Sequence, residues 1–101
     1  MKESQFYIYL LTNKFNNVLY IGVTRNLKQR IMIYQRHINL SSFVKRYKLT
    51  KLVYFEIYSQ LTDAINREKQ LKNWHRQWKI NLVNSINPDW VDLKGPILME
   101  E

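Results

Sequence analysis

The tyrosines near the start of the sequence have the types and spacing of a reactive site. Residues 6–31 contain two similar triplets, Tyr7-Ile8-Tyr9 and Tyr20-Ile21-Gly22, and basic residues follow them. If the triplets lie on paired antiparallel strands with Thr12 opposite Asn17, Tyr9 stands directly opposite Tyr20. Two adjacent phenols can orient a water molecule or a phosphate oxygen. The alternative is a ladder of tyrosines that only stabilises the outer face of a sheet.

A polar row on the first predicted helix offers a cation beside these phenols. Arg30, Tyr34 and His37 are spaced at i, i+4 and i+7, which places them on one helical face. A guanidinium group can bind phosphate oxygens in a bidentate manner, so Arg30 is a candidate phosphate ligand. Each of the three residues could instead be an ordinary surface or half-buried side chain.

An acidic residue lies on the apolar side of the later helix. At about 100° per residue, Glu68 projects near the middle of an apolar stripe. That stripe comprises Leu61, Ala64, Ile65, Leu71 and Trp78. Because an ionised carboxylate is rarely placed on a core-facing stripe without a partner, Glu68 is a candidate ligand for Mg²⁺ or Mn²⁺. The alternative is an i,i+4 ion pair with Lys72, which contributes about 0.3–0.5 kcal/mol at a surface.

The charge distribution predicts a polyanionic partner. The chain has 16 Lys and Arg against 8 Asp and Glu, which gives a formal charge of +8 and a pI near 9.8. Between Ser4 and Phe55 there are nine basic residues and no acidic residue. A field of one sign attracts nucleic acid through phosphate contacts and counterion release. We expect nucleic acid rather than a membrane as the partner, since the basic segments lack a long apolar helical face. The alternative is that the charge serves solubility alone.

The composition excludes several other classes. The absence of cysteine excludes disulfides and thiolate zinc sites, and two histidines cannot form a zinc site alone. There is no apolar run of the length that spans a membrane, and the opening residues MKESQ lack the apolar segment of a signal peptide. We therefore expect a cytoplasmic protein.

The apolar pattern predicts one small α/β domain of the α+β type. Strands are predicted at Phe6–Thr12, Val18–Thr24 and Leu52–Tyr58. One helix is predicted from Leu27 to about His37, and a short basic turn or helix at Phe43–Tyr47. A later helix is predicted from Thr62 to about Ser85, with a break allowed at Trp74. Asn26 has the type and position of an N-cap for the first helix. The order β-β-α-β-α-α suits a small three-stranded antiparallel sheet flanked by helices. The domain is expected to span residues 1–101, with a core at about 6–93 and a tail at 94–101.

The hairpin register also assigns the faces of the sheet. With Thr12 opposite Asn17, one face of the hairpin is entirely apolar and is predicted to be core. It comprises Phe6, Ile8, Leu10, Leu19, Ile21 and Val23. On the other face Gly22 lies opposite Tyr7 and leaves an opening for a ligand or backbone. Val53, Phe55 and Ile57 are expected to share one face of the third strand, and Trp90 and Val91 to dock on the body of the protein.

Taken together, these residues resemble the GIY-YIG nuclease superfamily, in particular its small single-domain branch, which is similar to the N-terminal nuclease domain found in the excinuclease ABC system. The two triplets correspond to the signature triplets, Arg30 to the family's arginine, and Glu68, within REKQLKNW, to its glutamate. NPDWVDL is similar to the ending of that branch. Two positions depart from the pattern: Tyr7 replaces the first Gly, and Val23 stands where repair relatives carry a lysine.

The resemblance implies a metal-dependent DNA endonuclease, with a role in DNA repair or processing. Glu68 would bind Mg²⁺ or Mn²⁺, and Arg30 would hold a phosphoryl oxygen. Either Tyr9 or Tyr20 would accept the proton of the attacking water, and Tyr34 would orient water or phosphate. The departure at Tyr7 leaves this phenol chemistry in place, whereas Val23 removes lysine assistance to Tyr20.

The basic residues expected to hold the DNA backbone are Lys28, Arg36, His37, Lys45, Arg46 and Lys48. The DNA could be branched, nicked or single-stranded. Two other functions are open at this point. One is a non-catalytic nucleic-acid-binding module that retains the nuclease fold, and the other is a structural protein whose basic face meets an acidic partner.

Overall fold

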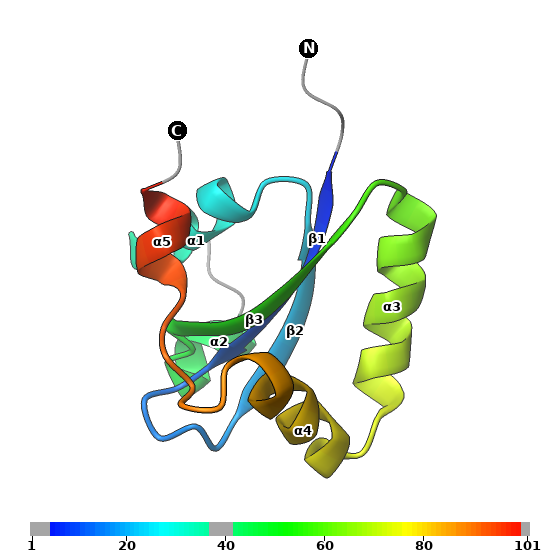
Figure 1. Cartoon of the computed structure of the whole chain (residues 1–101). Coiled ribbons are helices and arrows are strands. Elements are labelled where there is room, and N and C mark those ends of the chain that lie inside the picture. The colour runs from blue at the N-terminus through cyan, green and yellow to red at the C-terminus, as the bar shows by residue number, and fades with distance from the viewer. Residues whose placement is uncertain (1–4, 37–41, 100–101) are drawn as a thin grey trace.

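The computed structural model describes residues 5–36 and 42–99 of the chain. Its elements, in chain order, are β1 (Phe6–Thr12), β2 (Leu19–Thr24), α1 (Leu27–Gln35), α2 (Ser42–Tyr47), β3 (Lys51–Tyr58), α3 (Leu61–Asn73), α4 (Arg76–Ile86) and α5 (Lys94–Leu98). Within the described residues the strands form one three-stranded antiparallel sheet in the order β2-β1-β3 (Figure 1). The predicted α+β class is therefore confirmed, and the structure adds the short helix α5.

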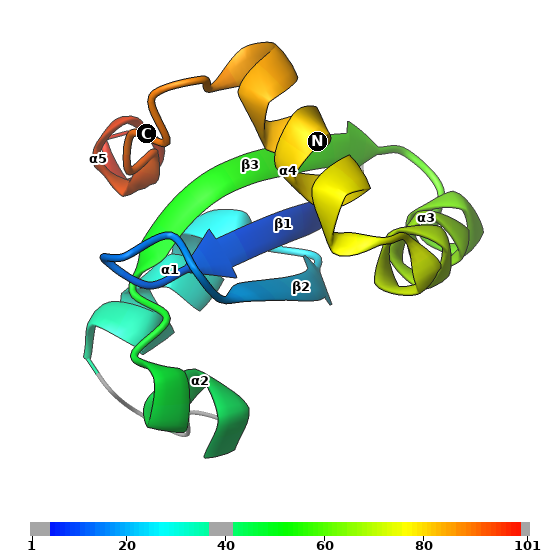
Figure 2. The ribbon, with the colours of Figure 1, turned by 90° about the horizontal axis from the view of Figure 1, so that it is seen from below.

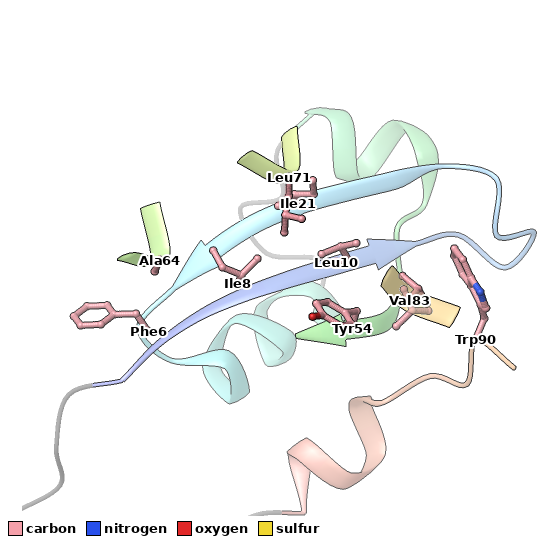
Figure 3. Packing of buried hydrophobic residues seen from close by; sticks show 10 residues of the cluster. Phe6, Ile8, Leu10, Ile21, Tyr54, Ala64, Leu71, Val83 and Trp90 are labelled. Carbon is pink, nitrogen blue, oxygen red and sulfur yellow. The ribbon is translucent and has the colours of Figure 1, made fainter. Parts of the chain in front are cut away.

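Helices cover both faces of the sheet, because both sets of alternating side chains are largely apolar. On one face Ile8 and Leu10 of the central strand pack against Leu71 of α3 and Val83 of α4 (Figure 3). On the other face a second cluster joins the sheet to α1, α2 and α5, which lie together on the opposite side from α3 in Figure 1. No helix within the described residues has the length and apolarity needed to cross a membrane.

The hairpin register differs by two residues from the prediction. Thr12 pairs with Leu19 rather than with Asn17, so residues 13–18 form the connection. Side chains close this loop: the Asn13 Nδ2 atom donates to Asn17 Oδ1 at 2.5 Å, and the Asn17 backbone N–H donates to Asn13 Oδ1 at 3.1 Å. Asn16 has a φ of 57°, a left-handed conformation that asparagine tolerates. The predicted four-residue loop was therefore too short.

A shift of two residues preserves the faces of the strands, and the predicted apolar core face is confirmed. The partner of the glycine changes, however, because Gly22 pairs with Tyr9 rather than with Tyr7. A Cβ atom built on Gly22 would lie 2.3 Å from the Tyr9 hydroxyl oxygen and 2.4 Å from Cζ. The glycine thus provides the space that the phenol of Tyr9 fills.

The third strand contains an irregularity that the sequence pattern did not reveal. Leu10 pairs with Tyr54 whereas Leu11 pairs with Leu52, so Val53 is left between them as a bulge. Val53 therefore belongs to the cluster under α3 and α4, while Phe55 packs on the opposite face. The expectation that Val53, Phe55 and Ile57 share one face was wrong.

The helical region after β3 breaks where a break was allowed. α3 ends at Asn73, Trp74 is extended with a ψ of 149°, and α4 begins at Arg76. The segment after α4 docks through Trp90, which is buried, whereas Val91 is exposed, contrary to the prediction.

Hydrogen bonds to backbone groups of β3 tie this C-terminal segment to the outer edge of that strand. The Leu52 N–H donates to Asp92 Oδ1 at 3.2 Å, and the Leu93 N–H donates to the Leu52 carbonyl at 2.8 Å. The Asn87 side-chain amide donates to the Val53 carbonyl at 3.0 Å. Residues 87–93 thus occupy backbone groups of β3 that face away from β1.

Candidate active site

The helix that carries the predicted arginine is fixed at both its start and its buried face. Asn26 is the N-cap, as predicted, and its Oδ1 accepts a hydrogen bond from the Gln29 N–H at 2.9 Å. Leu27 and Ile31 anchor α1 on the sheet. Arg30 is half-buried between this apolar contact and solvent. His37, the third member of the predicted polar row, lies outside the described residues.

Three tyrosines from three elements form a cluster on the face of the sheet under α1. We call Tyr9 of β1, Tyr20 of β2 and Tyr34 of α1 the tyrosine cluster. The hydroxyls of Tyr9 and Tyr34 share a hydrogen bond of 2.8 Å, and their ring centroids are 6.2 Å apart. The Tyr9 and Tyr20 centroids are 6.4 Å apart. The two phenols predicted to be directly opposite are therefore diagonal neighbours on the same face, because of the shifted register.

Burial differs between the two candidate base residues. Tyr9 is only 1% exposed, and burial raises the pKa of its phenol, with a further increase from Tyr34 and an opposing effect of the Arg30 charge. Tyr20 is half-buried, and burial also raises its pKa, as do Tyr34 and Glu68, again against Arg30. Both phenols are therefore protonated at neutral pH, and Tyr20 is the one with access to solvent.

The guanidinium group of Arg30 belongs electrostatically to this cluster. Partial burial lowers the pKa of Arg30, but the phenols of Tyr9 and Tyr34 more than compensate, so the pKa is raised. Arg30 therefore carries a fixed positive charge beside the phenols. A half-buried cation of this kind attracts a phosphate more strongly than a fully solvated one, because water screens it less.

Glu68 approaches the cluster from the other side of the sheet edge. Its helix α3 packs against the edge strand β2. The charge of Glu68 makes a smaller contribution to the raised pKa of Tyr20, after burial and Tyr34. Its side chain is 22% exposed, and Oε2 lies 3.5 Å from Lys72 Nζ. The i,i+4 pair considered above is thus present, and it leaves the carboxylate partly open to solvent.

The apolar stripe on which Glu68 was placed is narrower than predicted. Ala64 and Leu71 are buried, but Leu61 and Trp78 are largely exposed. The pattern was extended through Trp74, where the chain bends, so Trp78 belongs to a separate helix with its own orientation. On α3 itself, the half-buried Glu68 lies between the buried Ala64 and Leu71 and the half-buried Ile65.

A second acidic residue, for which the sequence pattern predicted no role, holds α3 in place. The Glu56 carboxylate accepts two hydrogen bonds from Arg67, both of 3.0 Å, and further bonds from the Tyr54 and Tyr58 hydroxyls. Burial raises the pKa of Glu56, but these donors outweigh it, so the pKa is lowered. Because Arg67 directly precedes Glu68, this ion pair fixes the rotation of α3 at that point. The only signal in the sequence was an acid inside an apolar strand.

The basic residues predicted to hold DNA lie on two helices. Lys28 is half-buried on α1, and Arg36 caps the end of that helix. Lys45 and Arg46 of α2, and Lys48 just after it, are exposed. α1 and α2 belong to the same apolar cluster, so these charges are carried by helices on one face of the sheet.

The residues described do not include a group of three or more His, Cys, Asp or Glu side chains that could hold a metal ion. A single carboxylate such as that of Glu68 suits a hard divalent cation that takes most of its ligands from water and substrate. Mg²⁺ commonly keeps several waters and takes one or two carboxylates together with substrate phosphates. A partly exposed carboxylate such as that of Glu68 suits a shared site of this kind.

Comparisons with known proteins show which family the chain resembles. A model of the GIY-YIG catalytic domain matches residues 5–81. A UPF0213 protein of Staphylococcus haemolyticus is 30% identical over 80 residues, which cover 79% of this chain and 95% of that protein. The UvrABC system protein C of Mycoplasma mycoides is 28% identical over 75 residues, which cover 73% of this chain and 13% of that protein.

The fold also has a counterpart among solved structures. The solution NMR structure of a UPF0213 protein from Bacillus halodurans superposes with a TM-score of 0.54 and 20% identity, over 87% of this chain and 92% of that one. At this identity the likeness concerns the fold alone. The matched residues 5–81 include both triplets, Arg30 and Glu68. The chain therefore belongs to the GIY-YIG catalytic-domain family, as the motifs in its sequence indicate.

Proposed function

We propose that this protein is a divalent-metal-dependent endonuclease that hydrolyses phosphodiester bonds in DNA, in the cytoplasm and in DNA repair or processing. One observation carries the proposal: Tyr9, Tyr20 and Tyr34, from three elements, lie together on one face of the sheet, and the charges of Arg30 and Glu68 act on the pKa of Tyr20. Membership of the family supports the nuclease class. The similarity to a UvrABC system protein C favours repair or processing as the setting.

Arg30 is the group we assign to the scissile phosphate. Its charge is fixed and it is half-buried, so it is already oriented before a substrate arrives. The negative charge that develops on the phosphoryl oxygens in the transition state is stabilised by such a preorganised cation. Losing one donor of this type commonly costs a factor of about 10²–10³ in rate.

Of the two candidate phenols, Tyr20 is the better positioned to meet water. Tyr9 is buried and its hydroxyl is engaged with Tyr34, so we assign Tyr9 to holding Tyr34 in place. Tyr20 reaches solvent, and the charges of Arg30 and Glu68 act on its pKa in opposite directions. As a protonated phenol it orients the attacking water. It can accept the proton of that water only as the phenolate, which forms near neutral pH only when positive charge lowers its pKa.

Glu68 is the residue that would hold Mg²⁺ or Mn²⁺. When bound, such an ion polarises the phosphate and stabilises the leaving oxygen. The contribution of the chain is the open carboxylate and its orientation, which the Glu56–Arg67 ion pair maintains from the neighbouring position of α3. Lys28, Arg36, Lys45, Arg46 and Lys48 would hold the DNA backbone without reading its sequence, and His37 is proposed to join them.

The test is cleavage of nicked, branched, single-stranded and duplex DNA in Mn²⁺ or Mg²⁺. We expect Glu68→Gln and Arg30→Ala to abolish cleavage while DNA binding is kept. Asp63→Asn is the matched control, since it removes an exposed carboxylate from the same helix. Equal trace cleavage by the wild type and by the Glu68 and Arg30 variants would indicate contamination, and the non-catalytic binding module would then be the better explanation.

A further inference from the structure

Two exposed aromatic side chains on α2 extend the tyrosine cluster toward solvent. Phe43 is 42% exposed and Tyr47 is 38% exposed. Their ring centroids are 4.8 Å apart, and the Phe43 centroid is 5.9 Å from that of Tyr20. Tyr20, Phe43 and Tyr47 therefore form a continuous line of rings, here called the aromatic row, which begins at the candidate active site and ends on the surface.

Phe43 and Tyr47 are not the residues that pack α2 against the rest of the protein. The short helix is anchored by Val44 and by Leu49, which follows it, and both are almost fully buried in the cluster under the sheet. Phe43 and Tyr47 stand on the outer side of that anchor. Adjacent large aromatic side chains that are exposed to solvent usually mark a binding surface.

The charges around the aromatic row indicate what binds there. Lys45 and Arg46 lie on the same short helix, and the Arg46 guanidinium carbon is 5.5 Å from the centre of the Tyr47 ring. The sequence has no acidic residue between Ser4 and Phe55. Aromatic faces interleaved with cations are how proteins bind unpaired nucleotides: bases stack on the rings, and phosphates meet the charges.

The position of α2 leaves this surface accessible. In Figure 2 the helix projects from the body of the protein next to β2, on the side away from α4 and α5. A base inside a duplex is already stacked on its neighbours and offers no free face to a ring. A base in a single strand, a flap or a gap offers one.

We propose that Phe43 and Tyr47 form a stacking site for an unpaired nucleobase next to the candidate active site, so that the preferred DNA carries an unpaired nucleotide beside the phosphate to be cleaved. This inference rests on the proposed function for its second half, whereas the stacking site itself can be tested without catalysis. Tyr20 would then join the two sites, with its ring beside Phe43 and its hydroxyl near Arg30.

The test compares a single-stranded oligonucleotide with an abasic strand of the same length, which carries the same phosphates and no bases. Binding of the full chain is measured by fluorescence anisotropy in EDTA, so that no cleavage occurs. The wild type should bind the base-bearing strand about 5- to 150-fold more tightly for each base that stacks. The double variant Phe43→Leu/Tyr47→Leu should lose this preference, and Phe43→Trp should keep it.

Two matched variants separate stacking from charge and from general exposure. Phe15→Leu makes the same change at an exposed phenylalanine in the β1–β2 loop, where Lys14 lies 5.0 Å from the ring centroid, and should leave the preference unchanged. Lys45→Gln should weaken binding of the base-bearing and abasic strands by the same factor. Circular dichroism of each variant confirms that it is folded.

Equal affinity of the wild type for the two strands would overturn the inference. So would a folded double leucine variant that keeps the preference, or equally tight binding of an acidic peptide. Cleavage in Mn²⁺ is scored separately. If Glu68-dependent cleavage persists without a base preference, only the stacking site is refuted; if the preference exists and no DNA is cleaved, the stacking site is supported and the nuclease is refuted.

Discussion

Replacing Gly22 with alanine tests whether the glycine exists to make room for Tyr9. The added Cβ would lie 2.3 Å from the Tyr9 hydroxyl oxygen, 2.4 Å from Cζ and 2.9 Å from Cε1. These distances are shorter than any van der Waals contact, so the buried phenol must move and its 2.8 Å hydrogen bond with Tyr34 must break. Gly22 has an ordinary negative φ, so backbone strain plays no part.

The expected loss of stability combines three contributions. Overpacking of a filled site costs about 1–3 kcal/mol. The lost hydrogen bond costs about 1 kcal/mol more. Alanine fits a strand better than glycine, which returns about 0.5–1 kcal/mol. Gly22→Ala should therefore lower the free energy of unfolding by about 1–3.5 kcal/mol, measured by urea denaturation followed by circular dichroism. It should also lower the cleavage rate.

Two further variants make the test specific. Gly95→Ala is the control, because a Cβ there meets no atom within 4 Å, and its stability should be unchanged or slightly raised. In a Tyr9→Leu background, the three atoms that the new Cβ meets are gone, so Gly22→Ala should cost less than about 0.5 kcal/mol. The same loss of unfolding free energy in both backgrounds would refute the claim that Gly22 makes room for Tyr9. A Gly22→Ala variant as stable as the wild type would refute it as well.

Three other predictions concern charge. Because the folded-state pKa of Glu56 is lowered from 4.5, its ion pair with Arg67 stabilises the fold above about pH 4.5 and loses this effect as the pH falls further; Glu56→Gln should be less stable at pH 7 and show a smaller decline on acidification in urea titrations. Glu68→Gln should lower the pKa of Tyr20, since the carboxylate contributes to raising it, and spectrophotometric titration against a Tyr20→Phe background identifies that phenol. Lys45→Gln should reduce the slope of log affinity for single-stranded DNA against log salt by about 0.7, and an unchanged slope would mean that Lys45 contacts no phosphate.

The sequence was sufficient for the parts of the fold that depend on local periodicity. Strands and faces follow from alternation over residues 6–12, and the start of α1 follows from the chemistry of Asn26 as an N-cap. The break at Trp74 was anticipated as well. These features depend on neighbouring residues, so a single sequence contains the necessary information.

The features that were missed depend on contacts between distant residues or on side chains in loops. The observed hairpin register differs from the predicted one by two residues, because the side chains of Asn13 and Asn17 hydrogen-bond to each other in the loop. No periodicity in the sequence predicts that contact. The bulge at Val53 arises from pairing with β1, and the Glu56–Arg67 ion pair joins a strand to a helix. In the candidate site, the residue types were proposed from motifs, whereas their burial, and hence the different positions of Tyr9 and Tyr20, came only from the structure.

The hydrogen bonds between residues 87–93 and β3 have a consequence for self-association. An outer strand of a sheet presents unpaired backbone groups that can template pairing with another molecule. Here Asp92 and Leu93 occupy the groups of Leu52, and Asn87 occupies the carbonyl of Val53. The C-terminal segment therefore protects this edge strand against aggregation. A chain shortened after α4 would expose an aggregation-prone apolar edge on β3, at the side of the sheet opposite the candidate site.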